Sequence, residues 1–355
     1  MKARRSLLQA ARWSSPGDFL ATYALIGVLV IIIAAFWALL PETFPTVANF
    51  QGIVDSQSVI AILALAVTLP LRTGEFDLSI GSVAVLTATT TAVLSAREGW
   101  NPVLSILAGL VVALVVGGIN CIAVLWVRIN AFIATLATMT IVAGVSLGIT
   151  STTVVTNISP AIVSVSQKQI LGLPLGAYYG WIIAILLWYI YRYTPFGPRG
   201  LFIGGSKDAA RLAGVRVVRI QALAFLGSAL LSGLAGIVIL GTLGGIDPSI
   251  GSQFLLPPYA AAFLGTATIA IGRFNVVGTL AGLYLIEVGV DGLQLWGASA
   301  WVSQVFYGGA LLMAVGAARL AAKSYRRKQD LEQGAAGAND ASNSVSKSAS
   351  DRVRG

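Results

Sequence analysis

Long apolar stretches without charges restrict how this sequence can fold more than any other feature. Each runs for about 17 to 25 residues, the length that a helix rising about 1.5 Å per residue needs to cross a bilayer core. With 56% hydrophobic and only 10% charged residues, the chain is more apolar than a soluble domain of this size. A transmembrane β-barrel would instead show alternating segments of about ten residues, and no such pattern runs through the chain. The sequence therefore predicts an all-α integral membrane protein.

About ten such stretches follow one another along the chain. They lie at residues 20–40, 57–71, 79–96, 102–127, 132–152, 178–191, 220–243, 257–271, 274–290 and 299–318. The second stretch contains Pro70 and the eighth contains Pro257 and Pro258, and a proline removes a backbone donor. Both of these stretches are short, so either could be a broken or re-entrant helix instead of a plain span. We expect about ten transmembrane helices, some of them short or broken.

The basic residues predict the orientation, because cytoplasmic loops near the ends of spans carry an excess of Lys and Arg. With the N-terminus inside, only Arg97 and Lys168 of the basic residues between the spans fall outside. An even number of spans, with the N- and C-termini both cytoplasmic, is the simplest solution. The net charge of +9 is then a topology signal and an attraction to anionic membrane lipid, and it is no evidence for nucleic-acid binding.

The two ends of the chain differ from the part between them. Residues 1–19 are expected to be a cytoplasmic N-terminal segment, because the apolar stretch that follows is too long for a cleavable signal peptide and has no small-residue cleavage site. Residues 20–320 form the transmembrane domain. Residues 321–355 are rich in Gly, Ala, Ser and Asn and poor in large apolar residues, which predicts a disordered cytoplasmic tail.

Missing residue types exclude most catalytic functions. The chain has no histidine, so the histidine-dependent nucleophile arrangements and the HExxH zinc site are excluded. The dipeptide Gly-Lys does not occur, so the chain has no Walker A loop for ATP. Cys121 is the single cysteine, which excludes an intrachain disulfide. We expect a non-catalytic protein that binds no metal and no cofactor of its own.

The longest polar segment between spans covers residues 192–219. It contains six basic residues and one acidic residue, Asp208, and is placed in the cytosol. Residues 206–215 predict a short amphipathic helix with Ser206 as N-cap and Gly214 as C-terminal stop. On residue types alone, both an ordinary basic loop and a functional element remain open.

This segment resembles the cytoplasmic coupling loop of sugar-type ATP-binding cassette importer permeases, the family of the ribose, galactose, xylose and autoinducer-2 permeases. The pattern of that loop is T-x-x-G-R, followed by A-x-G-x-N-x-x-A-A-R-x-A-G-I. Pro198 and Lys207 depart from it, since Pro198 is inserted before the Arg and Lys207 replaces the Asn. The resemblance implies a helix that docks on an ATPase subunit and transmits its closure. The matching residues are Thr194, Gly197, Arg199, Gly204, Gly205, Ala209, Ala210, Arg211, Ala213 and Gly214.

Three further stretches resemble the same family in the same order. Residues 74–83, GEFDLSIGSV, are similar to G-G-I-D-L-S-V-G-S, with Glu75 in place of the second Gly. Residues 129–145 are similar to a stretch beginning P-F-I-V-T-L-G-T-M, with Ala131 in place of the Pro. Residues 278–297 resemble the region of the ninth span, where Glu287 occupies a position that is usually small.

Polar residues within or beside spans are the candidates for a translocation pathway. Asp77 or Ser79 could be an N-cap for the following helix, and Asp77 could also organise a broken helix beside the pathway. Glu287 is ionisable within a span, so it is either functional or reaches toward the interface. The full candidate set is Asp77, Ser79, Asn120, Phe132, Thr135, Thr138, Glu287, Asp291 and Gln294.

Small residues spaced four apart predict close helix packing, as in Gly278 with Gly282 and in Ser228, Ser232 and Gly236. Such faces could pack within one chain or between two chains. The resemblance itself implies a second permease chain, in a homodimer or a heterodimer. It also implies a cytoplasmic ATPase subunit that binds the ATP and an extracytoplasmic solute-binding protein.

These observations predict a multi-pass permease subunit in a bacterial inner (plasma) membrane, forming the pathway for a sugar or similar small polar solute. The few polar groups in the spans favour weak binding of an uncharged solute, whose identity stays open. The alternative is an ion-coupled secondary transporter or channel that uses Asp77 and Glu287 as coupling carboxylates.

Overall fold

The computed structural model of the chain describes residues 16–316, and their regular elements are all helices apart from one short hairpin. Among them, six helices are long and apolar enough to cross a membrane. This confirms an all-α membrane protein. The expected tail at 321–355 and nearly all of the expected N-terminal segment at 1–19 lie outside the described residues.

The elements follow the order in which the apolar stretches occur. The N-terminal half contains α2 (Pro16–Leu39), α3 (Val47–Arg72), α4 (Ile80–Ala92) with η2 (Val93–Arg97), α5 (Pro102–Cys121) with η3 (Ile122–Trp126), α6 (Ala131–Thr150) and α7 (Pro160–Gln167). The hairpin of β1 (Gln169–Ile170) and β2 (Leu173–Pro174) comes next. Then come α8 (Leu175–Tyr193), α9 (Phe196–Gly205), α10 (Lys207–Leu212), α11 (Val217–Leu243), η4 (Ile250–Phe254), α12 (Leu256–Leu264), η5 (Gly265–Ala267) and α13 (Val276–Leu295). A last helix, Trp301–Gly316, runs to the end of the described part.

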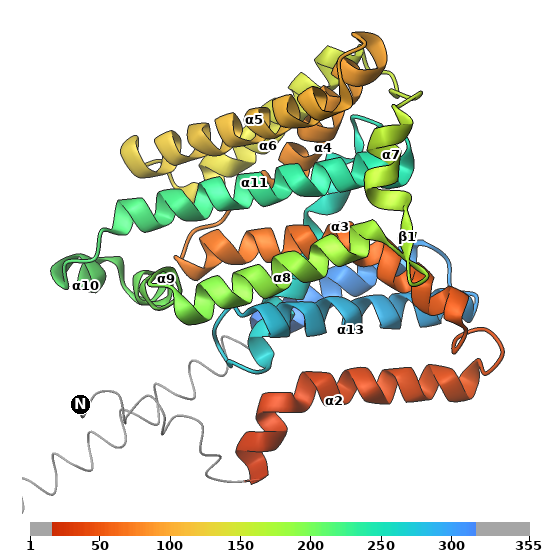
Figure 1. Ribbon diagram of the computed structural model, residues 1–355. Coiled ribbons are helices and arrows are strands. Elements are labelled where there is room, and N and C mark those ends of the chain that lie inside the picture. Colours follow the sequence, from red (N-terminus) through yellow and green to blue (C-terminus); the bar gives the residue numbers. More distant parts are fainter. Residues whose placement is uncertain (1–15, 317–355) are drawn as a thin grey trace, which may run out of the picture.

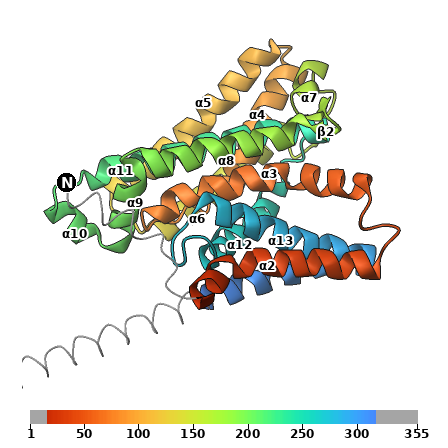
Figure 2. The ribbon, with the colours of Figure 1, turned by 60° about the horizontal axis from the view of Figure 1, so that its bottom comes forward.

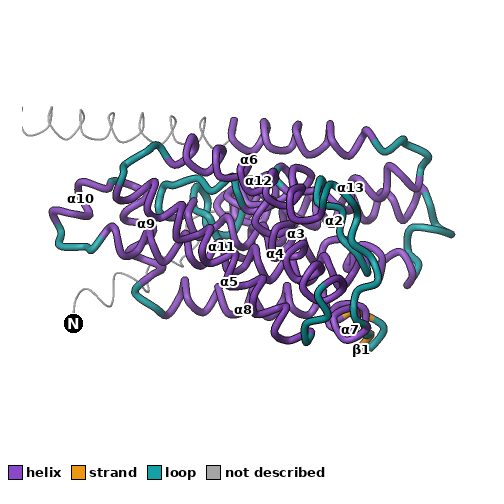
Figure 3. The backbone as a smooth tube through the Cα atoms, turned by 90° about the horizontal axis from the view of Figure 1, so that it is seen from above, coloured by secondary structure: helices purple, strands orange, loops and turns teal. Residues whose placement is uncertain are grey.

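The long helices lie roughly side by side, so their connections gather at two opposite ends of the bundle (Figure 1, Figure 2). Seen from above, loops again lie at both ends of the helical mass (Figure 3). The short helices α9 and α10 lie at one end, which we call the α9–α10 end. Helix α7 and the hairpin lie at the opposite end, which we call the α7 end. Helices α3 and α11 are central. In their most apolar 18-residue segments, 78% and 72% of the segment is buried, against 28% for α5 and for α6. The inner helices are thus surrounded by protein, while α5 and α6 present large apolar faces outward.

Side-chain caps mark where several spans begin. Asn101, Asn130 and Asn275 each accept a hydrogen bond from a backbone N–H in the first turn of α5, α6 and α13, respectively. Helix α11 ends at Gly244, which has a positive φ of 64° and closes the helix in the left-handed conformation.

Of the two possibilities left open for the second stretch, the structure shows an unbroken helix, which is longer than the expected stretch at 57–71. Helix α3 is one continuous helix of 26 residues that begins at Val47 and passes through Pro70 to Arg72. Pro70 lies in the last turn, so the missing N–H interrupts little of the helix. The first turns of α3 were missed because Asn49, Gln51 and Asp55 interrupt the apolar pattern there.

The eighth stretch, at residues 257–271, is a broken helix and not a plain span, which is one of the two possibilities that the sequence left open. Helix α12 covers only nine residues, with Pro257 and Pro258 in its first turn, where proline costs no intrahelical bond. It is preceded by η4 and followed by η5, and at Thr268 the chain becomes extended. This interrupted segment packs against α3 and α13.

Small residues bring α4 and α11 into close contact inside the bundle. A Cβ added to Gly236 would overlap the backbone carbonyl oxygen of Ala84. Likewise, a Cβ on Gly278 or Gly282 would overlap the backbone of Gly265 or Ala261. These faces therefore mediate packing within the chain.

Charge separates the two ends of the bundle. Of the described basic residues, only Arg97 and Lys168 belong to the α7 end, where Glu42, Glu98 and Asp247 also lie. There the backbone N–H and hydroxyl of Ser249 donate to Asp247 and lower the pKa of its carboxyl group. The α9–α10 end carries Arg72, Arg128, Arg192, Arg199, Lys207, Arg211, Arg216, Arg219 and Arg273.

The close contact of α4 with α11 leads to a first prediction. Changing Gly236→Ala should destabilise the detergent-solubilised protein by about 1–3 kcal/mol, because the added methyl group has no room beside Ala84. Gly144→Ala in α6 is the matched control, since nothing lies within 4 Å of its added Cβ. Thermal unfolding midpoints measure both, and equal midpoints for the two variants would contradict the packing.

Candidate functional site

The connection between α3 and α4 re-enters the protein instead of staying at the surface. After Arg72 the chain turns at Gly74, whose φ is +79°, and α4 begins at Ile80. Asp77 in this connection contacts Ser228 of α11. Ser228 lies eleven residues beyond the first residue of α11, or about 16 Å along the helix. That is roughly half of a bilayer core of about 30 Å, so Asp77 lies at membrane depth.

A ring of donors surrounds the buried Asp77 carboxylate. Its Oδ1 accepts from the hydroxyl of Ser79 at 2.6 Å and from the N–H of Ser79 at 3.1 Å. Its Oδ2 accepts from the hydroxyl of Ser228 at 2.9 Å. The backbone N–H of Asp77 donates to the hydroxyl of Tyr259 in α12 at 3.1 Å. These bonds fix the connection against α11 and α12.

The hydrogen bonds continue from Ser79 into α5 and α6. The side-chain amide of Asn120 donates to the hydroxyl of Ser79 at 2.9 Å, and its carbonyl oxygen accepts from Thr138 at 2.7 Å. The hydroxyl of Thr135 accepts from the N–H of Leu78 at 3.1 Å. We call this set the Asp77 network; it consists of Asp77, Ser79, Asn120, Thr135, Thr138, Ser228 and Tyr259, all of them buried.

The Asp77 network settles how the α3–α4 connection is held. Ser79 occupies the N-cap position of α4, but its side chain makes no capping bond there. Asp77 instead binds the N–H and hydroxyl of Ser79 and ties this turn to a second helix through Ser228. A buried carboxylate is stable only with several donors, and these donors come from different parts of the chain. The network therefore holds five elements in one arrangement: the α3–α4 connection, α5, α6, α11 and α12.

Glu287, Asp291 and Gln294 lie elsewhere, on α13. Glu287 accepts from the hydroxyl of Ser56 in α3 at 3.1 Å and from that of Tyr307 at 3.3 Å. Asp291 accepts from the amide of Asn49 at 3.0 Å. Among the described residues, these carboxylates share no hydrogen-bonding partner with Asp77. Glu287 and Asp291 therefore form a group separate from the Asp77 network.

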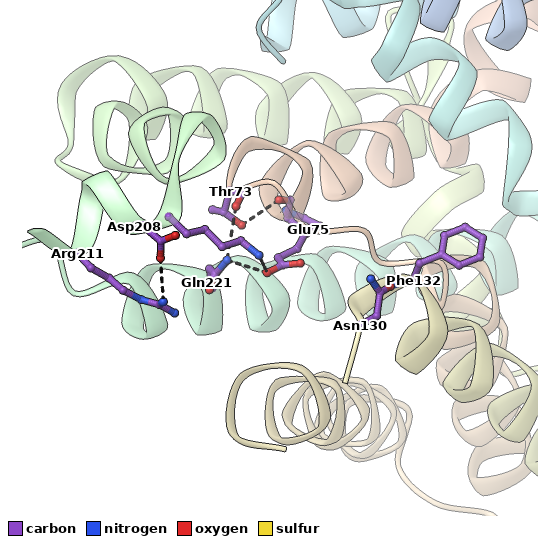
Figure 4. Close-up of polar contacts among 9 residues, drawn as sticks. Thr73, Glu75, Asn130, Phe132, Asp208, Arg211 and Gln221 are labelled. Atoms are coloured by element: carbon purple, nitrogen blue, oxygen red, sulfur yellow. Dashed lines mark hydrogen bonds and ion pairs between the residues drawn. The ribbon is translucent and has the colours of Figure 1, made fainter. Parts of the chain in front are cut away.

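Two further candidates lie outside both groups. Gln294 donates to the hydroxyl of Ser303 at 2.8 Å, toward the end of α13. Phe132, at the start of α6, is half exposed, and its ring points away from the polar side chains of Glu75 and Gln221 (Figure 4).

The 192–219 segment forms two short helices at the basic end of the bundle. Helix α10 begins after Ser206, whose hydroxyl accepts from the N–H of Ala209 at 3.2 Å. Gly214 follows it with a φ of +78°, so the expected helix and both of its end signals are confirmed. Helix α9, which contains Pro198, was not expected from the sequence.

Arg72 fixes α9 to the end of α3. Its guanidinium donates to the carbonyl oxygen of Gly197 at 3.3 Å and to that of Phe274 at 2.5 Å. It also lies 4.2 Å from the ring centroid of Tyr191 in α8, a cation–π contact. Arg72 thus holds α8, α9 and the start of α13 around one buried side chain.

Helix α10 is fixed to the α3–α4 connection by charge. The ammonium group of Lys207 lies 2.6 Å from Oε1 of Glu75, and the amide of Gln221 in α11 donates to the same oxygen at 2.8 Å (Figure 4). Gln221 also reaches the carbonyl oxygen of Thr73 at 3.5 Å. Glu75 is only two residues from Asp77, so α10 and the Asp77 network attach to the same short connection.

The outer surface of α9 and α10 is exposed. Leu212 is 91% exposed, while Ala210 of the same helix is fully buried. Of the residues that carry the resemblance, Gly197 and Ala210 are buried and Thr194 is half-buried. The exposed ones are Arg199, Gly204, Gly205, Ala209, Arg211, Ala213 and Gly214.

Sequence reasoning missed several residues that hold this site together. Ser228 and Gln221 are ordinary polar residues of an apolar helix, and Arg72 was counted only as a basic residue of a loop. Tyr191 and Tyr259 resemble interfacial aromatics in sequence. Their partners lie far away along the chain, so no local spacing could have indicated these contacts.

Comparison with known proteins identifies the family. Residues 49–315 match the model of a family described as branched-chain amino acid transport system / permease component. The chain belongs to this permease family. The ribose import permease protein RbsC of Bacillus subtilis is 31% identical over 84% of this permease and 91% of its own length.

Other relatives are also permeases of sugar importers. The D-allose transport system permease protein AlsC of Escherichia coli is 28% identical over 85% of this permease and 92% of its own length. The fructose import permease protein FrcC of Rhizobium meliloti is 29% identical over 81% and 82%, respectively. No solved structure gives a significant match.

The Asp77 network leads to a second prediction. Asn120→Leu keeps the side-chain volume but leaves the hydroxyls of Ser79 and Thr138 without this partner. It should destabilise the permease by about 1–2 kcal/mol. Thr140→Val is the control, because the half-exposed Thr140 bonds only to its own helix. Thermal unfolding in detergent checks this, and a midpoint as high as that of the control would contradict the network.

Proposed function

We propose that this permease is the membrane subunit of an ATP-driven importer for a monosaccharide. The relatives are named for ribose, allose and fructose import, and these solutes are uncharged and rich in hydroxyl groups. The described spans contain many hydroxyl-bearing side chains and few ionisable ones, which supports an uncharged cargo. In this proposal the protein is a multi-pass subunit of a bacterial inner membrane.

The observation that carries the proposal is the attachment of α9 and α10 at the basic end. Lys and Arg gather at the cytoplasmic side of a membrane protein, so we assign the α9–α10 end to the cytosol. We further propose about ten crossings with both termini cytoplasmic, as the apolar stretches and the basic residues predict. A partner ATPase would then dock on α9 and α10, burying Leu212 and binding to the exposed Arg199 and Arg211. The ATP would be bound and hydrolysed by that partner.

Two other partners complete the proposed importer. The hairpin at the α7 end exposes Leu171 by 95%, which makes its tip a candidate contact for an extracytoplasmic solute-binding protein. A second permease chain, identical or different, would pack against the exposed apolar faces of α5 and α6. The pathway would then lie between the two chains.

The ion-coupled alternative has little support. A coupling site would bring its carboxylates to one binding position, whereas Asp77 and Glu287 have separate sets of partners. In addition, two of the four hydrogen bonds of Asp77 stay within the connection, at Ser79, and the other two reach α11 and α12, which favours a structural role.

Reconstitution tests the proposal directly. Proteoliposomes that contain the permease, the ATPase subunit that copurifies with it and its solute-binding protein should take up radiolabelled D-ribose, D-allose or D-fructose only when ATP is supplied. A non-hydrolysable ATP analogue is the control. Uptake by the permease alone, driven by a proton gradient without ATP, would overturn the proposal and favour the ion-coupled carrier.

The turn after α10 allows a more specific prediction. Gly214→Val places a β-branched residue at a φ of +78°, at a cost of about 1–3 kcal/mol, and should distort α10 and reduce ATPase copurification. Gly214→Asn is the matched control, because Asn tolerates this conformation. Arg211→Ala should weaken copurification without distorting the turn. Equal ATPase recovery with all three variants would contradict docking at α10.

A further inference from the structure

Two of the residues that depart from the family pattern, Glu75 and Lys207, contact each other. Glu75 replaces a Gly and Lys207 replaces an Asn, and neither Gly nor Asn carries a charge. The two residues are 132 positions apart, yet the Lys207 ammonium lies 2.6 Å from the Glu75 carboxylate. This chain therefore has an ion pair where the pattern allows none.

The position of the pair distinguishes it from an ordinary surface salt bridge. The Glu75 side chain is only 10% exposed, and that of Lys207 is 43% exposed. An ion pair with one buried member is screened less by water than an exposed pair. Gln221 also donates to the same carboxylate oxygen, so α10, α11 and the α3–α4 connection meet at one atom.

A second contact lies beside the pair, between α9 and the end of α3, and it behaves differently. Gly204, at the end of α9, packs so closely on Arg72 and Gly74 that an added Cβ would overlap the carbonyl oxygen of Arg72. Such packing resists compression but not separation, because van der Waals attraction between a few atoms is weak. An ion pair resists separation.

We propose that Glu75 and Lys207 form a strap through which α10 pulls on the α3–α4 connection. A movement of α9 and α10 toward the bundle is transmitted by the contact of Gly204 in α9, and a movement of α10 away from the bundle is transmitted by the strap. The displacement reaches Asp77 two residues later and, through its hydrogen bonds, α5, α6, α11 and α12. Glu75 and Lys207 are thus positioning residues for the coupling of ATP hydrolysis to transport, an inference that rests on the proposed function.

The test uses the full importer in proteoliposomes and measures sugar taken up per ATP hydrolysed. Lys207→Gln leaves the Glu75 carboxylate buried with one amide donor, so this variant should lose both stability and coupling. The double variant Glu75→Gln, Lys207→Gln removes both charges, so it should recover stability but stay uncoupled. We expect it to take up about fivefold less sugar per ATP, or still less.

Two controls isolate the pair. Lys207→Arg keeps the charge, and the cavity of about 330 Å³ that borders the pair has room for the larger side chain, so uptake per ATP should stay near that of the wild type. Arg97→Gln removes a comparable tether at the α7 end, where Arg97 donates to Thr150 and Thr153, and should also leave uptake per ATP unchanged.

The outcomes separate the strap from the permease proposal. If the double variant assembles and takes up as much sugar per ATP as the wild type, or if Lys207→Arg loses as much as Lys207→Gln, the strap is overturned and the permease proposal stands. If the wild-type importer shows no ATP-dependent uptake, both fail. If the double variant does not assemble, Lys207→Gln and Lys207→Arg decide the question by themselves, because Lys207 is half exposed.

Discussion

The structure depends on keeping one carboxylate stable at the depth of a membrane. Asp77 lies in a non-helical connection, where both its side chain and its backbone need partners that lipid cannot supply. Ser79, Ser228 and Tyr259 supply them, and Asn120 and Thr138 extend the network to two further helices. The break between α3 and α4 is possible only because α11, α5, α6 and α12 surround it.

Much of the fold was predictable from the sequence because its main signal is local. A helix in lipid must satisfy its own backbone, so an uninterrupted apolar stretch is enough to predict one, and most of the expected spans are present. The errors have the same origin. The first turns of α3 are polar because Asn49 and Ser56 face Asp291 and Glu287 of α13, a contact that the local pattern cannot indicate.

The candidate site was predictable in its parts but not in its assembly. Asp77, Ser79, Asn120, Thr135 and Thr138 were singled out individually. The structure joins them through Ser228, which the sequence marked only as a small packing residue, and through Tyr259, which no motif marked. Glu287 and Asp291 were assigned to the same pathway, yet they belong to a different contact. Hydrogen-bonding partners more than a hundred residues apart are set by helix packing, and composition and spacing contain no information about it.

The continuity of α3 bears on how the two ends of the bundle can move. Twenty-six residues without a break make a rod of about 39 Å, fixed at Arg72 beside α9 and buried along most of its length. A rod of this kind cannot shorten, and its middle is held by α11 and α8. A rotation of α3 about this held middle that opens a gap at one end narrows the space at the other, so a rigid α3 couples the two ends in opposite senses.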